Sequence, residues 1–106
     1  MNAITSDASK IGVGLRKLGS TNLLSIPDRQ CTIGRDGSNS IVLEGDPSVS
    51  RFHCVITVEN GNYYIRDLHS WNGTIVNSQP VQSRQRVYYG DFLRVGVTRF
   101  EFVANH

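Results

Sequence analysis

Apolar side chains recur along most of the chain, either in short runs or in alternation with polar ones. Roughly ten such segments can be distinguished between residues 12 and 103, separated by Gly, Pro, Asn, Asp and Ser. No window of helical length repeats apolar side chains at helical spacing. The pattern predicts an all-β sandwich or barrel of short strands. Residues 1–10 lack the pattern, and we expect a disordered lead there, followed by one folded domain at 11–106.

The dipeptide Asn60-Gly61 separates two predicted strands and is typical of a two-residue type I′ turn, in which both central residues have positive φ. The turn sets a hairpin register that pairs Glu59 with Asn62, Val58 with Tyr63, Thr57 with Tyr64 and Ile56 with Ile65. One face of this hairpin is then assigned to the core: Cys54, Ile56, Val58, Tyr63 and Ile65. The other face, with Thr57, Tyr64 and Arg66, points to solvent. Residues 48–53 and 69–74, at the open end, are expected to lie together.

The composition narrows the functional classes. The net charge of +2 is too mild to indicate nucleic-acid binding, yet nine of the eleven basic residues are arginine, the side chain preferred for planar contacts to oxyanions. The N-terminus lacks the pattern of a signal peptide, and no apolar run reaches the ~20 residues of a membrane helix. Cys31 and Cys54 lie in apolar, strand-like segments and are expected to be buried free thiols. We therefore expect a cytoplasmic protein (nuclear in a eukaryote) that does not insert into membranes.

Three polar loops carry the candidate chemistry, at residues 34–40, 46–53 and 67–74, and each joins two apolar strands. A serine hydrolase is disfavoured because Ser50 and His53 are close in sequence and no nucleophile elbow is present. Zinc is disfavoured because His53 and Cys54, as neighbours at the start of a strand, point to opposite faces. Arginine, hydroxyl groups and free backbone N–H groups suit a phosphate ester better. We therefore expect no catalytic activity, no metal site and no cofactor in this domain.

Four motifs occur in order along the chain: I-G-R at 33–35, N-S-I-V-L at 39–43, S-R-x-H at 50–53 and D-L-x-S-x-N-G-T at 67–74. Their order and spacing resemble the forkhead-associated (FHA) domain over residues 15–103. The resemblance implies an FHA/SMAD-like β-sandwich of about 11 strands, in two twisted and mostly antiparallel sheets with binding loops at one apex. It also implies a module that binds phosphothreonine in partner proteins of Ser/Thr-kinase signalling, and we expect the isolated domain to be a monomer.

By the same resemblance, Arg35 contacts the phosphate, and Ser50 donates its hydroxyl to the phosphate oxygens, with its backbone N–H as a second candidate donor. Arg51 lies beside the phosphate, and Asn72 binds the peptide backbone next to the phosphorylated residue. Ser70 and Trp71 complete the expected peptide-binding set.

The expected loop framework consists of Gly34, His53, Gly73 and Thr74. His53 ties the loop to a neighbouring strand, and the two glycines permit backbone conformations that a side chain would forbid.

Two positions depart from the family pattern. Trp71 stands where a hydroxyl residue is common, so one donor is lost and an indole is gained that either meets the ligand or covers the loop. Ser78 stands where glycine is common after Asn77, so that turn is expected to differ. The alternative function is a phosphate-independent scaffold or self-association domain on the same fold, with Trp71 and the Tyr88-Tyr89 pair as its apolar surface.

Overall fold

The computed structural model describes residues 12–27 and 29–105, and the lead expected at residues 1–10 lies outside the described residues. Eleven strands form two sheets in the described chain, and these residues contain no helix. The strands are β1 (Gly12–Lys17), β2 (Leu23–Ser25), β3 (Gln30–Gly34), β4 (Ile41–Val42), β5 (Cys54–Glu59), β6 (Asn62–Asp67), β7 (Thr74–Val76), β8 (Gln79–Pro80), β9 (Arg84–Val87), β10 (Phe92–Val95) and β11 (Thr98–Asn105).

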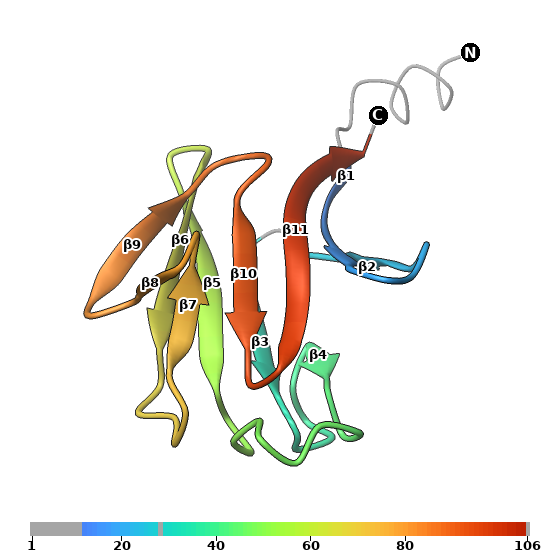
Figure 1. Ribbon diagram of the computed structural model, residues 1–106. Helices are drawn as coiled ribbons and strands as arrows, with labels where there is room; N and C mark the ends of the chain where they lie inside the picture. The colour runs from blue at the N-terminus through green and yellow to red at the C-terminus, as the bar shows by residue number, and fades with distance from the viewer. Residues whose placement is uncertain (1–11, 28, 106) are drawn as a thin grey trace.

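The two sheets pack face to face as a sandwich (Figure 1). The six-stranded sheet has the order β2-β1-β11-β10-β7-β8, and the five-stranded sheet has the order β4-β3-β5-β6-β9. All pairings within them are antiparallel except that of β3 with β4. This is the predicted fold class, and the strand number agrees with the one that the family resemblance implied. Gly12 pairs with Asn105, so the two ends of the described chain lie together, away from the loops at the lower end of Figure 1.

The predicted hairpin is confirmed as β5 and β6. All four cross-strand pairs occur in the predicted register, and the turn has φ of 54° at Asn60 and 77° at Gly61. Cys54, Ile56 and Ile65 are fully buried, whereas Arg66 on the opposite face is exposed. The register thus places the entry to β5 beside the exit from β6, which is the geometry that the site requires.

The core between the sheets is apolar and draws on both of them. Its buried residues are Leu15, Ile26, Cys31, Ile33, Ile41, Val49, Cys54, Ile56, Ile65, Val76, Val87, Leu93, Val95, Phe100 and Phe102. Both cysteines are buried and unbridged, as predicted, and burial raises the pKa of the Cys31 thiol to about 12. Burial also raises the pKa of the Cys54 thiol, so both remain protonated and unreactive at neutral pH.

The sequence pattern missed one strand, β8, which has only two residues and no alternation to detect. The turn before it contains Asn77 and Ser78, with φ of 48° and 70°. Both lie in the left-handed region, so the turn keeps the geometry suited to glycine although serine occupies its second position. Serine at the second position therefore places local strain in this turn.

Candidate functional site

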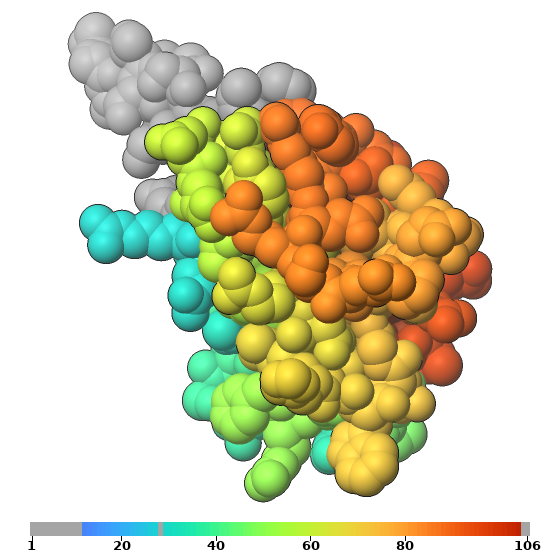
Figure 2. All heavy atoms as spheres, turned by 90° about the vertical axis from the view of Figure 1, so that its left-hand side faces the viewer, coloured from blue at the N-terminus to red at the C-terminus, as the bar shows by residue number. Residues whose placement is uncertain are grey.

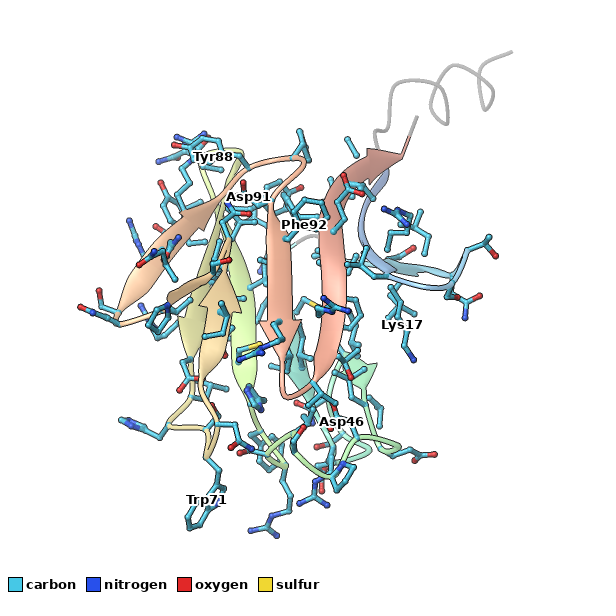
Figure 3. The ribbon with its side chains drawn as sticks, viewed as in Figure 1. Lys17, Asp46, Trp71, Tyr88, Asp91 and Phe92 are labelled. Carbon is cyan, nitrogen blue, oxygen red and sulfur yellow. The ribbon has the colours of Figure 1, made fainter. Side chains whose placement is uncertain are left out.

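Three loops meet at one end of the sandwich, and we call them the apical loops: 35–40 between β3 and β4, 43–53 between β4 and β5, and 68–73 between β6 and β7. In Figure 3, Trp71 projects from the last of these loops at the end of the molecule farthest from Tyr88. The space-filling view in Figure 2 shows the loops as a rim of protruding side chains below the face of β6 and β9.

The first loop is joined to the second by close backbone contact. Arg35 N donates to Ser50 O at 3.0 Å, and Asp36 N donates to Arg51 O at 3.1 Å. A Cβ at Gly34 would lie 2.1 Å from Arg51 O, so no side chain fits at this position. Asn39, which is buried, donates through Nδ2 to the same Arg51 carbonyl at 2.8 Å. The need for glycine at position 34 therefore comes from lack of space, because its φ is not positive.

Asp46 fixes the second loop to the turn between β10 and β11, beside which it lies in Figure 3. Its Oδ2 accepts from Val97 N at 3.0 Å and from the Thr98 hydroxyl at 2.7 Å. Its Oδ1 accepts from Ser48 N at 2.9 Å and also from the Ser48 hydroxyl. Burial alone would raise the pKa of this carboxyl, but the four hydrogen bonds outweigh burial and lower the pKa to about 2.

Asp67 organises the third loop in a similar way. Its Oδ1 accepts from the Ser70 hydroxyl at 2.6 Å and from the Thr74 hydroxyl at 2.7 Å, while Oδ2 accepts from Ser70 N at 3.0 Å. The Ser70 oxygen in turn accepts from Gly73 N at 2.9 Å. Burial raises the pKa of Asp67, but these hydrogen bonds prevail and the pKa is lowered. Gly73 has a φ of +78°, which favours glycine at this position.

His53 joins the second and third loops from a fully buried position. Ser50 N donates to His53 Nδ1 at 3.0 Å, and His53 Nε2 lies 2.9 Å from Gly73 O. Because Nδ1 accepts and a carbonyl can only accept, the ring must be neutral with its hydrogen on Nε2. The ring therefore sets the distance between Ser50 and the Gly73 turn.

With these bonds made, a few donors at the rim stay available. Arg35 Nε donates to Val49 O at 2.6 Å, and its two terminal Nη groups have no partner among the described residues. Ser50 Oγ accepts from Trp71 N at 2.9 Å, which occupies a lone pair and leaves the hydroxyl hydrogen free to be donated. The side chain of Arg51 is exposed and likewise makes no hydrogen bond or ion pair within the described chain.

These donors surround one open hollow of about 300 Å³. Its walls are formed by Arg35, Ser50, Arg51, Phe52, Leu68, His69 and Trp71. Trp71, which lies at the edge of the hollow, is 90% exposed. Asn72 stands next to the hollow and does not line it. Its Nδ2 donates to Ser48 O at 2.8 Å, which leaves the second amide hydrogen and the amide oxygen facing solvent. The hollow can thus receive an anion with several acceptor atoms.

Three expected roles change in the light of this geometry. The Ser70 hydroxyl donates its only hydrogen to Asp67 and accepts from Gly73 N, so it has no hydrogen left to donate to a phosphate oxygen. The Ser50 backbone N–H is donated to His53 and is not free for a ligand. Trp71 and Tyr88 lie at opposite ends of the sandwich, so they do not form the single apolar surface of the alternative hypothesis (Figure 3).

Sequence reasoning assigned no role to the framework residues Asp46, Asp67 and Asn39, although Asn39 and Asp67 begin two of the four motifs. Asp46 and Asp67 each precede a serine by two or three positions, and this spacing is the signal for the side-chain-to-backbone turns that they form. The third, Asn39, gives no comparable signal, because its partner carbonyl is twelve residues away in the chain.

Neither a metal site nor a membrane-spanning helix occurs in the described part of the chain. Residues 12–27 and 29–105 hold no group of three or more His, Cys, Asp or Glu side chains placed to bind a metal ion. Over the same residues, no helix has the length and apolar character needed to cross a membrane.

Comparisons with known proteins agree with this geometry. Residues 31–96 match the model of the FHA domain family. The oxoglutarate dehydrogenase inhibitor of Corynebacterium efficiens is 37% identical over 73 residues, which cover 69% of this chain and 50% of that protein. The glycogen accumulation regulator GarA of Mycolicibacterium smegmatis is 36% identical over 86 residues, covering 81% of this chain and 52% of that protein. The chain therefore spans about half the length of these relatives.

A solved structure of EmbR from Mycobacterium tuberculosis, in complex with a low-affinity phosphopeptide, superposes with a TM-score of 0.87. It is 29% identical, and the match covers 95% of this chain and 27% of that one. With the family match over residues 31–96 and the two-sheet sandwich described above, this chain belongs to the FHA domain family.

Proposed function

We propose that this domain binds phosphothreonine in partner proteins and serves as a phosphorylation-dependent interaction module in Ser/Thr-kinase signalling. The observation that carries the proposal is the open hollow at the apex, where the free ends of Arg35 and Arg51 and the Ser50 hydroxyl meet. Support also comes from EmbR, a structural neighbour that was solved with a phosphopeptide.

The chemistry of the ligand matches the donors in the hollow. A phosphomonoester carries about −1.5 to −2 charges at neutral pH and three strong acceptor oxygens. Arg35 offers two Nη groups in a rigid fork, Ser50 offers one hydroxyl, and Arg51 adds a second positive charge. The remaining amide groups of Asn72 suit the backbone of an extended peptide beside the phosphate. Phosphate and main chain are then bound by neighbouring loops.

The expected affinity follows from these contacts. Hydrogen bonds to charged groups contribute roughly 1.5–3 kcal/mol each. Three or four of them, less the cost of ordering an extended peptide, correspond to a micromolar Kd, which is a binding free energy of about −8 kcal/mol. Burial of the threonine methyl would favour phosphothreonine over phosphoserine by roughly 0.8 kcal/mol, or about fourfold.

We also propose that the domain binds its partner without catalysing a reaction. The His53 ring and the carboxylates of Asp46 and Asp67 are hydrogen-bonded within the loops, and the Ser50 hydroxyl is placed to bind an anion. Two free, buried thiols suit a reducing compartment, so we place its action in the cytoplasm, or in the nucleus of a eukaryote. We further propose that the isolated domain is a monomer.

The direct test is a titration with matched peptides. A degenerate library with fixed phosphothreonine would first select a sequence, which is then synthesised with phosphothreonine, phosphoserine and threonine. Fluorescence anisotropy should give micromolar binding for the first, weaker binding for the second and none for the third. Equal affinity for phosphorylated and unphosphorylated peptide would instead support the phosphate-independent scaffold.

Variants locate the binding in the hollow. Arg35→Ala and Ser50→Ala should each abolish measurable binding, whereas the matched control Arg84→Ala, on the outer face of β9, should bind normally. Thermal denaturation checks that each variant remains folded. Unchanged titrations for both apical variants would contradict the proposal.

A further inference from the structure

A larger hollow lies on the side of the sandwich, outside the apical site. It has a volume of about 730 Å³ and opens on the outer face of β7, β10 and β11. We call it the lateral hollow; its walls are Leu18, Ile75, Asn77, Ser78, Phe92, Leu93, Arg94 and Arg99. None of these residues lines the apical hollow. Figure 3 shows Phe92 toward the end of the molecule opposite Trp71. The two hollows are therefore separate surfaces.

Two unpaired arginines mark the lateral hollow. Arg94 on β10 and Arg99 on β11 are direct cross-strand partners, and both are exposed. Neither guanidinium makes a hydrogen bond or ion pair with any described residue. Like charges placed directly opposite each other destabilise a sheet. On the same sheet, by contrast, Arg16 is paired across the strands with Glu101 and forms a salt bridge with it.

The surface between the arginines and β7 is apolar. Phe92 is 49% exposed, and Ile75, the cross-strand partner of Arg94, is half-buried beside it. Leu18 contributes a third apolar side chain to the wall. No acidic side chain lines the hollow among the described residues. Glu101, the cross-strand partner of Phe92 on the same face, is already paired with Arg16, so the surface combines an apolar patch with two arginines that lack an ionic partner.

We propose that the lateral hollow is a second docking surface, which binds an acidic segment of a partner protein that also carries hydrophobic side chains, independently of phosphorylation. A carboxylate placed between Arg94 and Arg99 can accept from both guanidinium groups and removes their repulsion. A hydrophobic side chain of the same segment covers Phe92 and Ile75. Volumes of this order receive a few side chains.

The segment is bound through its side chains and does not add a strand to the sheet, because the edge strand near the hollow is β8. This strand has only two residues, and one of them, Pro80, has no N–H to donate. A nucleic acid fits the surface less well, because two arginines and a single exposed ring offer neither a basic track nor a series of stacking platforms.

The proposal can be tested with an unphosphorylated, fluorescein-labelled peptide of alternating Glu, Asp, Leu and Phe, at physiological salt. We expect binding by anisotropy, and amide shifts of the ¹⁵N-labelled domain confined to β7, β10, β11 and the adjoining wall residues Leu18, Asn77 and Ser78. Arg94→Glu and Arg99→Glu should each weaken binding about tenfold or more. Phe92→Ala should weaken it severalfold.

The matched control is Arg66→Glu, which makes the same charge change at an exposed and unpaired strand position of the other sheet. It should leave binding unchanged. Arg35→Ala should also bind the acidic peptide normally, and Arg94→Glu should still bind phosphopeptide, so the two surfaces are tested separately. The proposal is overturned by equal losses in Arg94→Glu and Arg66→Glu, by no binding of the peptide, or by shifts at the apical loops. Tighter binding of a dT₁₂ oligonucleotide through Arg94 and Arg99 would also overturn it.

Discussion

The apex and the outer face of β9 both display exposed arginines, but these arginines are bonded very differently. On β9, Arg84 donates to Glu59 at 2.8 Å and lies over the ring of Tyr64, and Arg86 donates to Asn62 and lies over the ring of Tyr88. At the apex, by contrast, Arg35 is held only at Nε and its fork is open.

Exposure alone therefore does not distinguish a binding arginine from a structural one. On β9, each guanidinium donates through one outer Nη group to a side chain of its own sheet and lies with one face over a tyrosine ring, so its outer end is bound to the fold. At the apex, Arg35 is anchored at one atom, so its orientation is set while its outer donors remain unused. A donor held in place by the fold loses less conformational entropy when it binds, which favours affinity.

Removal of the ring that joins the apical loops should have the largest effect. His53→Ala breaks the bonds to Ser50 N and Gly73 O and leaves a cavity, so the free energy of unfolding should fall by about 3 kcal/mol. Urea denaturation measures this loss. Phosphopeptide affinity should fall as well, because Ser50 is no longer fixed. A variant with wild-type stability and affinity would show that the ring is not needed to hold the donors.

Asp46→Asn should cost on the order of 2 kcal/mol, because an amide nitrogen would face donors where a carboxylate oxygen accepts. The native pKa of Asp46, about 2, lies below that of the unfolded chain. Its charged form therefore stabilises the fold above about pH 4, and that contribution is lost as the pH falls from about 4 through about 2. The variant should show a shallower loss of stability over this range in acid titrations followed by circular dichroism. An identical acid profile would contradict the assignment.

A third region, the Asn77-Ser78 turn, is strained because both residues have positive φ, and it lies outside the apex and the face of β9. Ser78→Gly removes the cost of a left-handed serine, partly offset by the greater freedom of glycine in the unfolded chain, so stability should rise by about 0.5–1 kcal/mol. Thermal unfolding measures the gain, and phosphopeptide affinity should not change. The matched control Ser83→Gly, in the loop before β9 and outside the positive-φ positions, should not stabilise. A loss of stability in Ser78→Gly would show that the serine is not strained.

The smallest effect is expected on β9. Glu59→Gln removes the ion pair with Arg84, in which both side chains are nearly half exposed, and should cost at most about 0.5 kcal/mol, less in high salt. Phosphopeptide affinity should be unchanged. A clear loss of affinity would mean that the face of β9 contributes to binding and that the contrast with the apex is wrong.

The sequence predicted the fold well where the physical signal is local. The Asn60-Gly61 turn sets the register of β5 and β6, and alternation identifies the buried face of both strands. Strand β8 could not be found, because two residues show no periodicity. The positions of Arg35, Ser50 and Arg51 around one hollow agree with the residues that the motifs named, although their roles in binding remain proposals.

The bonding within the loops was harder to foresee. Whether the Ser70 hydroxyl points to a ligand or to Asp67 depends on how two strands end, and a motif does not specify that. The reason for Gly34 is similar, since the carbonyl that excludes a side chain belongs to Arg51, seventeen positions along the chain. Contacts between loops depend on the packing of the whole sandwich, so a single sequence segment does not reveal them.

Trp71 is the only tryptophan of the chain, and its indole stands almost entirely in water at the edge of the apical hollow. The tryptophan emission of this protein therefore arises from the rim of the apical hollow and not from the core. A ligand that settles against the indole would shield it from quenchers such as iodide and shift its emission to shorter wavelength. The protein thus carries its own optical reporter of occupancy, which needs no label on either partner.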